Sequence, residues 1–398
     1  MDTTAEISKS EEKEKEKDME EAIKSFDELD ISPNLLRGIF SYGFETPSLI
    51  QSTAIKPMIE KRNLIAQAQS GTGKTGAFSI GALSRVVTAL HKTQILILSP
   101  TRELAGQSAG VITKIGSMMP ELHVKTIVGG TAIRDDARDM QRTIPHVIVG
   151  CPGRVYDMVC RKLIELDQLR LIVLDEADEM LSTGFEEQIY NIFQMIPETA
   201  TVALFSATLP PDILRISARF MKDPVTISVA ADKLSLDGIK QYYVSVENDQ
   251  QKYETLKDLY QNISMAQCII YCNSVQRVCT LYDAMMGDQF PACCIHGKMD
   301  RGERERAFNQ FKTGESRVLI SSDVTARGID VQQVNMVINF DVPSNVHNYL
   351  HRIGRSGRWG RKGTAINMVV KRDKGLVEDI EAYYCCQIDP LTEEVLGR

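Results

Sequence analysis

Residues 64–75 decide the fold: Leu64-Ile65-Ala66-Gln67 runs into Ala68-Gln69-Ser70-Gly71-Thr72-Gly73-Lys74-Thr75. The apolar run predicts a strand, and the glycine-rich run predicts a loop that opens a helix. The loop matches the pattern G-x-x-x-x-G-K-[ST], except that Ala68 replaces the first glycine. Small residues let backbone N–H groups surround phosphate oxygens, while Lys74 can reach the β- and γ-phosphates and Thr75 can hold Mg²⁺. We therefore expect phosphate binding; the alternative is a glycine-rich turn that only caps a helix.

Short apolar runs alternate with amphipathic helical stretches along both halves of the chain. In the first half the runs are Leu64-Ile65-Ala66, Ile95-Leu96-Ile97-Leu98, Val147-Ile148-Val149, Leu171-Ile172-Val173-Leu174 and Thr201-Val202-Ala203-Leu204-Phe205. In the second half they are Cys268-Ile269-Ile270-Tyr271, Arg317-Val318-Leu319-Ile320, Met336-Val337-Ile338 and Ala365-Ile366-Asn367-Met368-Val369. Continuous apolar runs followed by helices are typical of strands buried on both faces of a parallel sheet. The sequence therefore predicts two α/β domains in series, each a parallel sheet flanked by helices.

Composition suggests where these domains begin and end. The chain has 398 residues, 43% of them hydrophobic. That length suits two domains of about 150–200 residues each. Residues 1–24 alternate acidic and basic side chains and contain no aromatic residue, so we expect a disordered charged tail. Residues 230–238 are short and polar and predict a flexible linker, which leaves domains at 25–229 and 239–398.

Charge and cysteine usage limit the partners and the compartment. The net charge is -7, so contacts to a nucleic acid must come from local Arg and Lys clusters or from helix starts. The nine cysteines include no C-x-x-C pair, which favours reduced thiols in a cytosolic or nuclear protein. No apolar run approaches ~18 residues and the first residues form no signal sequence, so we expect neither a membrane span nor secretion.

A cluster of carboxylates follows one of the predicted strands. Asp175-Glu176-Ala177-Asp178 comes directly after Leu171-Ile172-Val173-Leu174. A carboxylate at the carboxyl end of a buried strand, beside a phosphate-binding loop, is well placed to hold Mg²⁺. We therefore expect Asp175 to bind the metal, and Glu176 to orient and deprotonate the attacking water. The alternative is an acidic start of a helix, which is favourable against the helix dipole.

With this tetrad and loop, the chain resembles the DEAD-box RNA helicases from about Phe26 to its C-terminus. The resemblance implies two RecA-like domains and assigns residues 68–75 to ATP. It identifies the run Gly43-Phe44-Glu45-Thr46-Pro47-Ser48-Leu49-Ile50-Gln51 as an adenine-reading motif. It also implies that Gln51 pairs with the adenine edge, which an amide can match, and that Phe26 packs on the ring. The alternatives are core packing for Phe26 and a surface amide for Gln51. Ser206 and Thr208 of Ser206-Ala207-Thr208 resemble the residues that couple the tetrad to domain closure.

Two further runs in the first half place a proline at or near a helix start. They are Pro100-Thr101-Arg102-Glu103-Leu104-Ala105 and Cys151-Pro152-Gly153-Arg154. Free N–H groups at a helix start, with an Arg beside them, make a phosphate cradle that does not read sequence. The resemblance assigns RNA contacts to Thr101, Arg102, Gly130 and Arg154, whereas plain helix capping is the alternative. Cys151 departs from the Thr of the family pattern, and we expect it to be the residue that caps the helix beginning at Pro152.

The second half carries the remaining motifs. In Arg301-Gly302-Glu303-Arg304, Arg304 matches the family's Gln-x-x-Arg pattern as an RNA contact, whereas Arg301 departs from it. In the run 322–330, the resemblance implies that Arg327 contacts RNA and that Asp330 contacts the ATP ribose. The run 351–362 contains five Arg and Lys residues. There the resemblance assigns Arg355 and Arg358 as fingers about one helical turn apart that reach the γ-phosphate; a loose nucleic-acid patch or a solvated basic loop is the alternative.

The resemblance implies an ATP-dependent RNA helicase that takes ATP and Mg²⁺, clamps single-stranded RNA and locally unwinds duplexes. Within the family, the chain is most similar to the translation-initiation (factor 4A) subgroup and to its exon-junction paralogue. We therefore expect a monomer that binds a scaffold protein of the cap-binding or a splicing-linked complex, in the cytoplasm or in the nucleus. Two alternatives stay open: an ATP-locked RNA clamp whose partners suppress hydrolysis, and an ATPase that remodels protein complexes without RNA.

Overall fold

The computed structural model describes residues 22–68, 71–182, 184–228, 239–262, 267–323, 334–356 and 363–392. The chain divides into two compact units between Ala231 and Asp232. The predicted linker 230–238 and most of the predicted tail lie outside the described residues, so the domain boundaries stay predictions. None of the described helices is long and apolar enough to cross a membrane.

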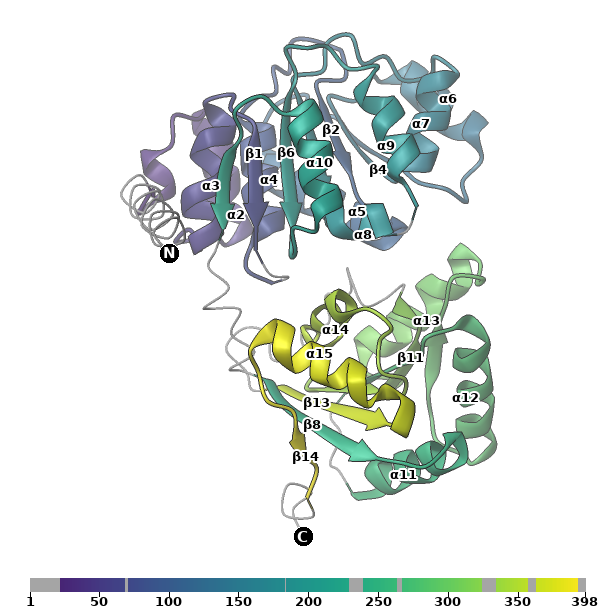
Figure 1. The fold of residues 1–398 in the computed structure, drawn as a ribbon. Coiled ribbons are helices and arrows are strands. Elements are labelled where there is room, and N and C mark those ends of the chain that lie inside the picture. The colour runs from purple at the N-terminus through teal and green to yellow at the C-terminus, as the bar shows by residue number, and fades with distance from the viewer. Residues whose placement is uncertain are drawn as a thin grey trace, which may run out of the picture. The chain divides into compact units, whose positions relative to one another are not determined.

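The first unit is built on a seven-stranded parallel sheet with the strand order β3-β4-β2-β5-β6-β1-β7 (Figure 1). The strands are β1 (Leu64–Gln67), β2 (Ile95–Leu98), β3 (Val124–Ile127), β4 (Val147–Gly150), β5 (Leu171–Asp175), β6 (Thr201–Ser206) and β7 (Val225–Ser228). The helices are α2 (Pro33–Tyr42), α3 (Leu49–Ile59), α4 (Lys74–Leu83), α5 (Arg102–Ile115), α6 (Ile133–Arg142), α7 (Pro152–Cys160), α8 (Ala177–Ser182), α9 (Glu186–Phe193) and α10 (Pro211–Phe220). The parallel sheet flanked by helices, predicted from the apolar runs, is confirmed.

Two apolar cores lie on the two faces of this sheet. Along β2, Ile95 and Ile97 belong to the core under α2, α3, α4 and α5. Leu96 and Leu98 alternate with them and belong to the core under α7, α8, α9 and α10. Successive side chains of a strand point to opposite faces, so helices on both faces require every residue of such a strand to be apolar. This explains the unbroken apolar runs of the sequence.

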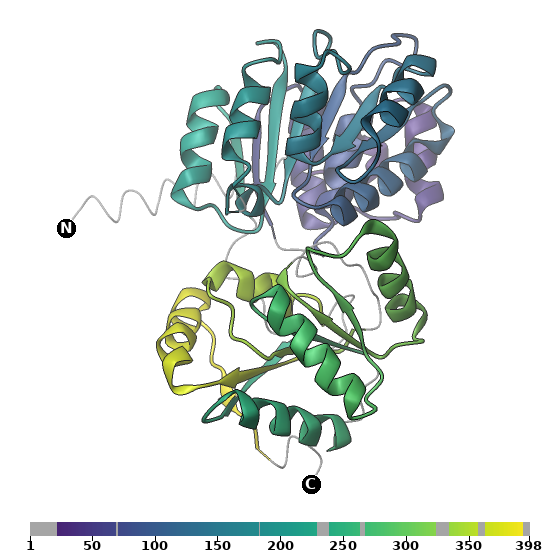
Figure 2. The same cartoon turned by 90° about the vertical axis from the view of Figure 1, so that its right-hand side faces the viewer.

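The second unit is a further seven-stranded parallel sheet, with the order β10-β11-β9-β12-β13-β8-β14 (Figure 2). The strands are β8 (Ile239–Ser245), β9 (Cys268–Tyr271), β10 (Cys293–Ile295), β11 (Val318–Ser321), β12 (Met336–Asn339), β13 (Gly363–Val369) and β14 (Asp389–Pro390). The helices are α11 (Asp249–Asn262), α12 (Val275–Gly287), α13 (Arg301–Thr313), α14 (Val346–Ile353) and α15 (Lys374–Tyr384). Counted along each unit, the strands follow the same order as in the first sheet.

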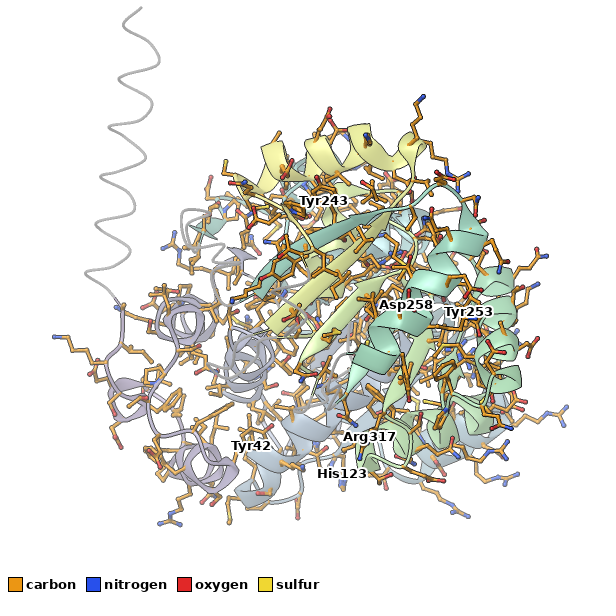
Figure 3. All side chains as sticks on the ribbon, turned by 90° about the horizontal axis from the view of Figure 1, so that it is seen from below. Tyr42, His123, Tyr243, Tyr253, Asp258 and Arg317 are labelled. Atoms are coloured by element: carbon orange, nitrogen blue, oxygen red, sulfur yellow. The ribbon has the colours of Figure 1, made fainter. Side chains whose placement is uncertain are left out.

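The helices again divide between the two faces of the sheet. Helices α11 and α12 share one apolar core, whereas α13 packs on the other face. Tyr253 of α11, labelled in Figure 3, donates its hydroxyl to Asp288 Oδ2 at the end of α12 (3.0 Å). Helices α14 and α15 pack together against β13. The second α/β domain of the prediction is thereby confirmed.

Candidate nucleotide and RNA site

The carboxyl edge of the first sheet divides into two halves. The predicted phosphate-binding, metal-binding and coupling residues of this unit lie at or after the ends of β1, β5 and β6, whereas its predicted RNA contacts follow β2, β3 and β4. In the strand order β3-β4-β2-β5-β6-β1-β7, each of these sets of three is contiguous. In parallel sheets, ligands bind outside the carboxyl ends of the strands. The topology therefore gathers each set at one half of the same edge.

The glycine-rich loop joins β1 to α4 at the nucleotide half. Gly71 and Gly73 have φ values of +87° and +103°, a left-handed backbone that glycine adopts readily. Gly73 is the N-cap of α4, so Lys74 is the first residue of the helix. The backbone N–H of Ala68 donates to the carbonyl of Ser206 (2.9 Å), which ties the loop to the end of β6. Gln69 and Ser70 lie outside the described residues.

Lys74 is buried and pairs with the tetrad. Its Nζ lies 3.1 Å from Glu176 Oε1, with both side chains almost fully enclosed. Asp175 is buried beside them, and burial, followed by the charge of Glu176, raises the pKa of Asp175 to about 7. A buried carboxylate with a raised pKa lacks sufficient positive charge around it. Glu176 also has a φ of +51°, a left-handed backbone that non-glycine residues adopt only at some cost in free energy.

Ser206 and Thr208 both contact the last residue of the tetrad. Thr208 Oγ1 donates to Asp178 Oδ2 (2.8 Å), and Ser206 Oγ accepts from the backbone N–H of Asp178 (3.3 Å). All three residues are buried. The two hydroxyls predicted to couple the tetrad therefore hold the start of α8 against the end of β6. Asp178 is the carboxylate of the tetrad for which the sequence predicted no role.

Gln51 links its helix to the glycine-rich loop. Its Oε1 accepts from the backbone N–H of Ser48 (2.9 Å), and its Nε2 donates to the carbonyl of Gly73 (3.2 Å). A Cβ atom at Gly76 would lie 2.5 Å from Gln51 Nε2 and 2.9 Å from the Phe44 ring, so this turn of α4 needs glycine. Gln51 is thus a buried amide and not a surface one.

Two phenylalanines lie behind this turn. Phe26 is fully buried and packs against Phe40 and Phe44, with ring centroids 6.5 and 6.2 Å apart. Phe44 is only partly buried and lies next to Gln51 and Gly76. The packing of Phe26 on the adenine ring stays a prediction, and Phe44, which stands inside the quoted motif, contacts this turn of α4.

These residues fit a nucleotide with a divalent cation. Left-handed glycines bring the backbone of the loop close to a helix start, which is a site for phosphate. Asp175, Glu176 and Asp178 are three buried carboxylates, and Glu176 pairs with Lys74. The raised pKa of Asp175 shows that another cation would be favourable there. Asp175 and Thr75, the predicted metal ligands, offer oxygen atoms of the kind Mg²⁺ prefers.

Two helix starts stand side by side at the RNA half. β2 pairs with β4, and α5 follows β2 as α7 follows β4. Thr101 caps α5, because its hydroxyl accepts from the backbone N–H of Leu104 (3.3 Å). Cys151 is the N-cap of α7 and Pro152 its first residue, as predicted, but the Cys151 side chain makes no capping hydrogen bond. Burial raises the pKa of the Cys151 thiol to about 12.

Two arginines hold the loop that follows β3. A Cβ atom at Gly130 would lie 2.5 Å from Arg102 Nη1, so Arg102 rests directly on the glycine backbone. Arg154 donates through Nη2 to the carbonyl of Thr131 (2.9 Å) and through Nη1 to Asp136 Oδ2 (3.3 Å). The loop that follows β3 is therefore in contact with an arginine from each of the two helix starts. Arg154 additionally braces this loop, which the sequence did not indicate.

The second unit holds Arg304 and Arg355. Arg304 Nη2 donates to the carbonyl of Gly297 (2.8 Å), and Arg355 Nε donates to the carbonyl of His351 (3.2 Å). Helix α14 ends at Ile353, so Arg355 lies beyond the helix on which the predicted spacing relied. Arg327, Asp330 and Arg358 lie outside the described residues.

Arg352 lies in the basic run 351–362 and is fully buried. It donates to Asp323 Oδ1 (2.5 Å), to Asn273 Oδ1 (2.7 Å) and to the carbonyl of Asp341 (2.8 Å). These acceptors follow β11, β9 and β12, which are neighbours in the sheet. Arg352 therefore fixes the end of α14, and with it the backbone that leads to Arg355.

Comparison with known proteins identifies relatives across both units. A family model described as DEAD/DEAH box helicase matches residues 48–216, and one described as helicase conserved C-terminal domain matches residues 251–360. The ATP-dependent RNA helicase eIF4A of Neurospora crassa is 48% identical over 380 residues, which cover 96% of this chain and 95% of that protein. The eIF4A of Schizosaccharomyces pombe is 48% identical over 376 residues, covering 94% of this chain and 95% of that protein.

Solved structures show the same fold. S. cerevisiae Dbp5 bound to RNA and ADP BeF3 superposes with a TM-score of 0.87 at 34% identity, covering 94% of this chain and 98% of that chain. Mss116p bound to ssRNA and AMP-PNP superposes with a TM-score of 0.85 at 26% identity, covering 94% of this chain and 81% of that chain.

Proposed function

Because this chain belongs to the DEAD-box family of ATP-dependent RNA helicases, we propose that it clamps single-stranded RNA and locally separates duplexes during translation initiation. The family makes the chain an RNA-stimulated ATPase. The 48% identity with proteins named eIF4A, spread over 96% of the chain, supports translation initiation. The structural observation that best supports ATPase activity is the buried pair of Lys74 and Glu176 beside Asp175.

At the nucleotide half, each residue has a distinct part. Lys74 leaves Glu176 to bind the β- and γ-phosphates, whose charge outweighs that of one carboxylate. Asp175 and Thr75 hold Mg²⁺, which supplies the positive charge that the buried carboxylates need. Glu176, freed from Lys74, accepts a proton from the attacking water. Gln51 presents its amide to adenine, and its hydrogen bond to the carbonyl of Gly73 connects it to the glycine-rich loop.

At the RNA half, the contacts grip the sugar–phosphate backbone without reading bases. The starts of α5 and α7 offer free N–H groups, and Thr101, Arg102, Gly130 and Arg154 surround them. Arg304 adds a cation from the second unit. Such contacts suit a factor that acts on many RNA sequences, because they carry no sequence information.

The wider setting follows from the same relatives. We propose domains at 25–229 and 239–398 with a linker at 230–238, action as a monomer with a scaffold protein of the cap-binding complex, and a cytoplasmic location. We propose no role for the charged N-terminal residues 1–24.

The deciding experiment combines three measurements on the full chain. ATP hydrolysis is measured with and without RNA, strand separation is measured on a short RNA duplex, and rescue is measured in a translation extract depleted of its own eIF4A. We expect RNA to stimulate hydrolysis and the chain to restore translation. ATPase activity indifferent to RNA would favour the remodelling alternative. Retention of RNA and phosphate in a splicing scaffold complex, without rescue of translation, would favour the clamp.

A further inference from the structure

The cysteines of the second unit differ sharply in their surroundings. Cys268 and Cys272 are buried, and burial raises the pKa of the Cys272 thiol to about 12. Cys279 is only half-buried, and its Sγ lies 3.4 Å from Nε2 of His296. A thiol in contact with an imidazole can pass its proton to the ring, which leaves the nucleophilic thiolate. This pair has no part in the proposed ATPase.

A second thiol lies at the same helix–strand contact. Cys279 is on α12, and His296 directly follows the edge strand β10. Cys294 precedes His296 by two residues, so both side chains point to the same face of the sheet. Cys294 packs against the apolar core to which Val278 of α12 belongs. It is half-buried, and the helix that carries Cys279, α12, packs against β10, the strand that carries Cys294.

His296 presents a neutral imidazole to the Cys279 thiol. Burial, followed by the charge of Arg304, lowers the pKa of His296 below its ordinary value. The ring is therefore neutral near pH 7 and can accept the thiol proton. Its Nδ1 is shielded from solvent and has no hydrogen-bond partner among the described residues. The ring is thus held by packing and by its contact with Cys279.

The pair is connected to the proposed RNA contact in the second unit. Gly297 follows His296, and its carbonyl accepts from Arg304 Nη2 (2.8 Å). Arg304 is on α13, which packs closely against β10. A change that moves His296 therefore moves the carbonyl that positions Arg304.

We propose that Cys279, Cys294 and His296 form a peroxide-sensitive switch, in which a Cys279–Cys294 disulfide displaces His296 and weakens RNA binding through Arg304. The readout on RNA rests on the proposed function. In the first step the Cys279 thiolate attacks hydrogen peroxide: an S–O bond forms, the O–O bond breaks, and the leaving hydroxide takes the proton from His296 to become water. In the second step the Cys294 thiol attacks the sulfenic acid: the S–S bond forms, the S–O bond breaks and water leaves. Sulfur is oxidised by two electrons and the peroxide is reduced.

The test treats the reduced full chain with hydrogen peroxide in the presence of EDTA and removes the excess with catalase. A peptide map identifies disulfides, and fluorescence anisotropy measures RNA affinity at one fixed salt with a non-hydrolysable ATP analogue. We expect a Cys279–Cys294 disulfide and an RNA affinity reduced about tenfold, the scale of one lost charged hydrogen bond. Dithiothreitol should restore the affinity.

Three variants separate the switch from general oxidation. Cys279→Ser should keep its RNA affinity after peroxide, and Cys294→Ser should accumulate a sulfenic acid that dimedone traps. Cys385→Ser is the matched control, because Cys385 is exposed on the same unit and its Sγ contacts the carbonyl of Ala382 (3.8 Å) instead of an imidazole. It should respond to peroxide as the wild type does.

Several results would overturn the inference. They are equal loss of RNA affinity in Cys279→Ser, a disulfide that leaves RNA affinity unchanged, or neither a disulfide nor a dimedone adduct at Cys279. A reduced wild-type chain that binds no RNA would instead overturn the proposed function, and the peptide map would still report whether the disulfide forms.

Discussion

Glu176 combines the main physical features of the nucleotide site in one residue. It is buried, it pairs with Lys74 at 3.1 Å, and its φ of +51° places a non-glycine residue in the left-handed region. Such a backbone costs on the order of 1–3 kcal/mol and persists where the surrounding structure enforces it. Here the enforcement comes from Asp178, which Ser206 and Thr208 hold two residues further on. This backbone conformation directs the Glu176 carboxylate toward Lys74, and therefore toward the phosphate-binding loop.

We predict that Glu176→Gln keeps ATP binding and abolishes turnover. The amide retains the shape of the side chain but cannot accept the proton of water, and loss of a general base lowers kcat by about 10²–10⁴. RNA should then be released slowly, because hydrolysis no longer opens the clamp. Steady-state ATPase and RNA dissociation rates check this. Glu179→Gln, which removes the same charge three residues along α8, should turn over normally; hydrolysis by Glu176→Gln at the wild-type rate would disprove the role of Glu176.

Asp175 predicts a pH dependence of stability. Its pKa is raised to about 7 in the folded chain by burial and then by Glu176, whereas an unfolded Asp titrates near about 3.9. The folded state therefore binds this proton more tightly, so its contribution is full below about pH 4 and is lost as pH rises through about 7. Without nucleotide, the melting temperature of Asp175→Asn should exceed that of the wild type by a margin that grows as pH rises across that window. Calorimetry at fixed ionic strength measures the gap; an equal gap at both ends of the window would contradict the assignment.

At the scale of elements, the sequence predicted the interior strands and missed the edges. The runs around Ile97, Val173 and Ile270 were identified because helices on both faces require unbroken apolar residues. β3, β7, β10 and β14 are edge strands of the two sheets; three of the four residues of β3 are only half-buried, and β7 alternates more exposed with more buried residues. β8 is next to an edge and mixes polar with apolar residues in the same way. An edge strand needs fewer apolar positions, so its residues lack the signal that marks interior strands.

The residues of the candidate site divide in the same way, into those that the sequence predicted and those that it did not. The loop at Lys74 and the carboxylates at Asp175 follow strands and have a recognisable spacing, so the sequence alone predicted them. Contacts between distant residues could not be predicted in this way. Phe44 against Gly76, and Cys279 against His296, depend on how helices pack on the sheet. No spacing along the chain encodes that packing.

Helices α5 and α7 form a natural comparison of N-caps. They begin at the ends of the paired strands β2 and β4. Thr101 accepts a hydrogen bond from Leu104 N–H, whereas Cys151 makes none. Both caps have extended backbone, with ψ values of 157° and 141°, so the geometry for a capping hydroxyl exists at residue 151.

We therefore predict that Cys151→Thr stabilises the chain by about 0.5–1 kcal/mol, the usual scale of an N-cap hydroxyl. It should also tighten RNA binding modestly without changing ATP affinity. Thr101→Cys is the reciprocal control and should destabilise by a similar amount. Thermal unfolding of the full chain and RNA titration at one fixed salt measure both effects. No change in either would show that residue 151 neither caps α7 nor contacts RNA.

At the scale of the whole molecule, the two units repeat one topology, but only the first has a glycine-rich sequence after the strand that corresponds to β1. α11 follows β8 as α4 follows β1, and Lys252 of α11 pairs with Asp341 after β12 at 3.2 Å. This matches the place of Lys74 and Glu176 in the first unit. In the second unit both partners of the pair make further hydrogen bonds. Lys252 also donates to the carbonyl of Phe340 (2.7 Å), and Arg277 donates to Asp341. No glycine stands between β8 and α11. We therefore expect the nucleotide to bind at the first unit.

Among the described side chains of the second unit, Arg355 is the one that we expect to act on the nucleotide. Arg352 fixes the end of α14 through acceptors after β9, β11 and β12, so the backbone entering Arg355 is rigid. We predict that Arg355→Ala lowers RNA-stimulated hydrolysis by about 10³-fold or more, the scale of an arginine finger. ATP affinity of residues 25–229 alone cannot depend on Arg355, which lies outside them. Arg372→Ala removes an exposed cation from the same unit and should retain full stimulation. Steady-state ATPase assays over a range of RNA concentrations compare the two, and unchanged stimulation in Arg355→Ala would mean that the first unit completes the catalytic site without Arg355.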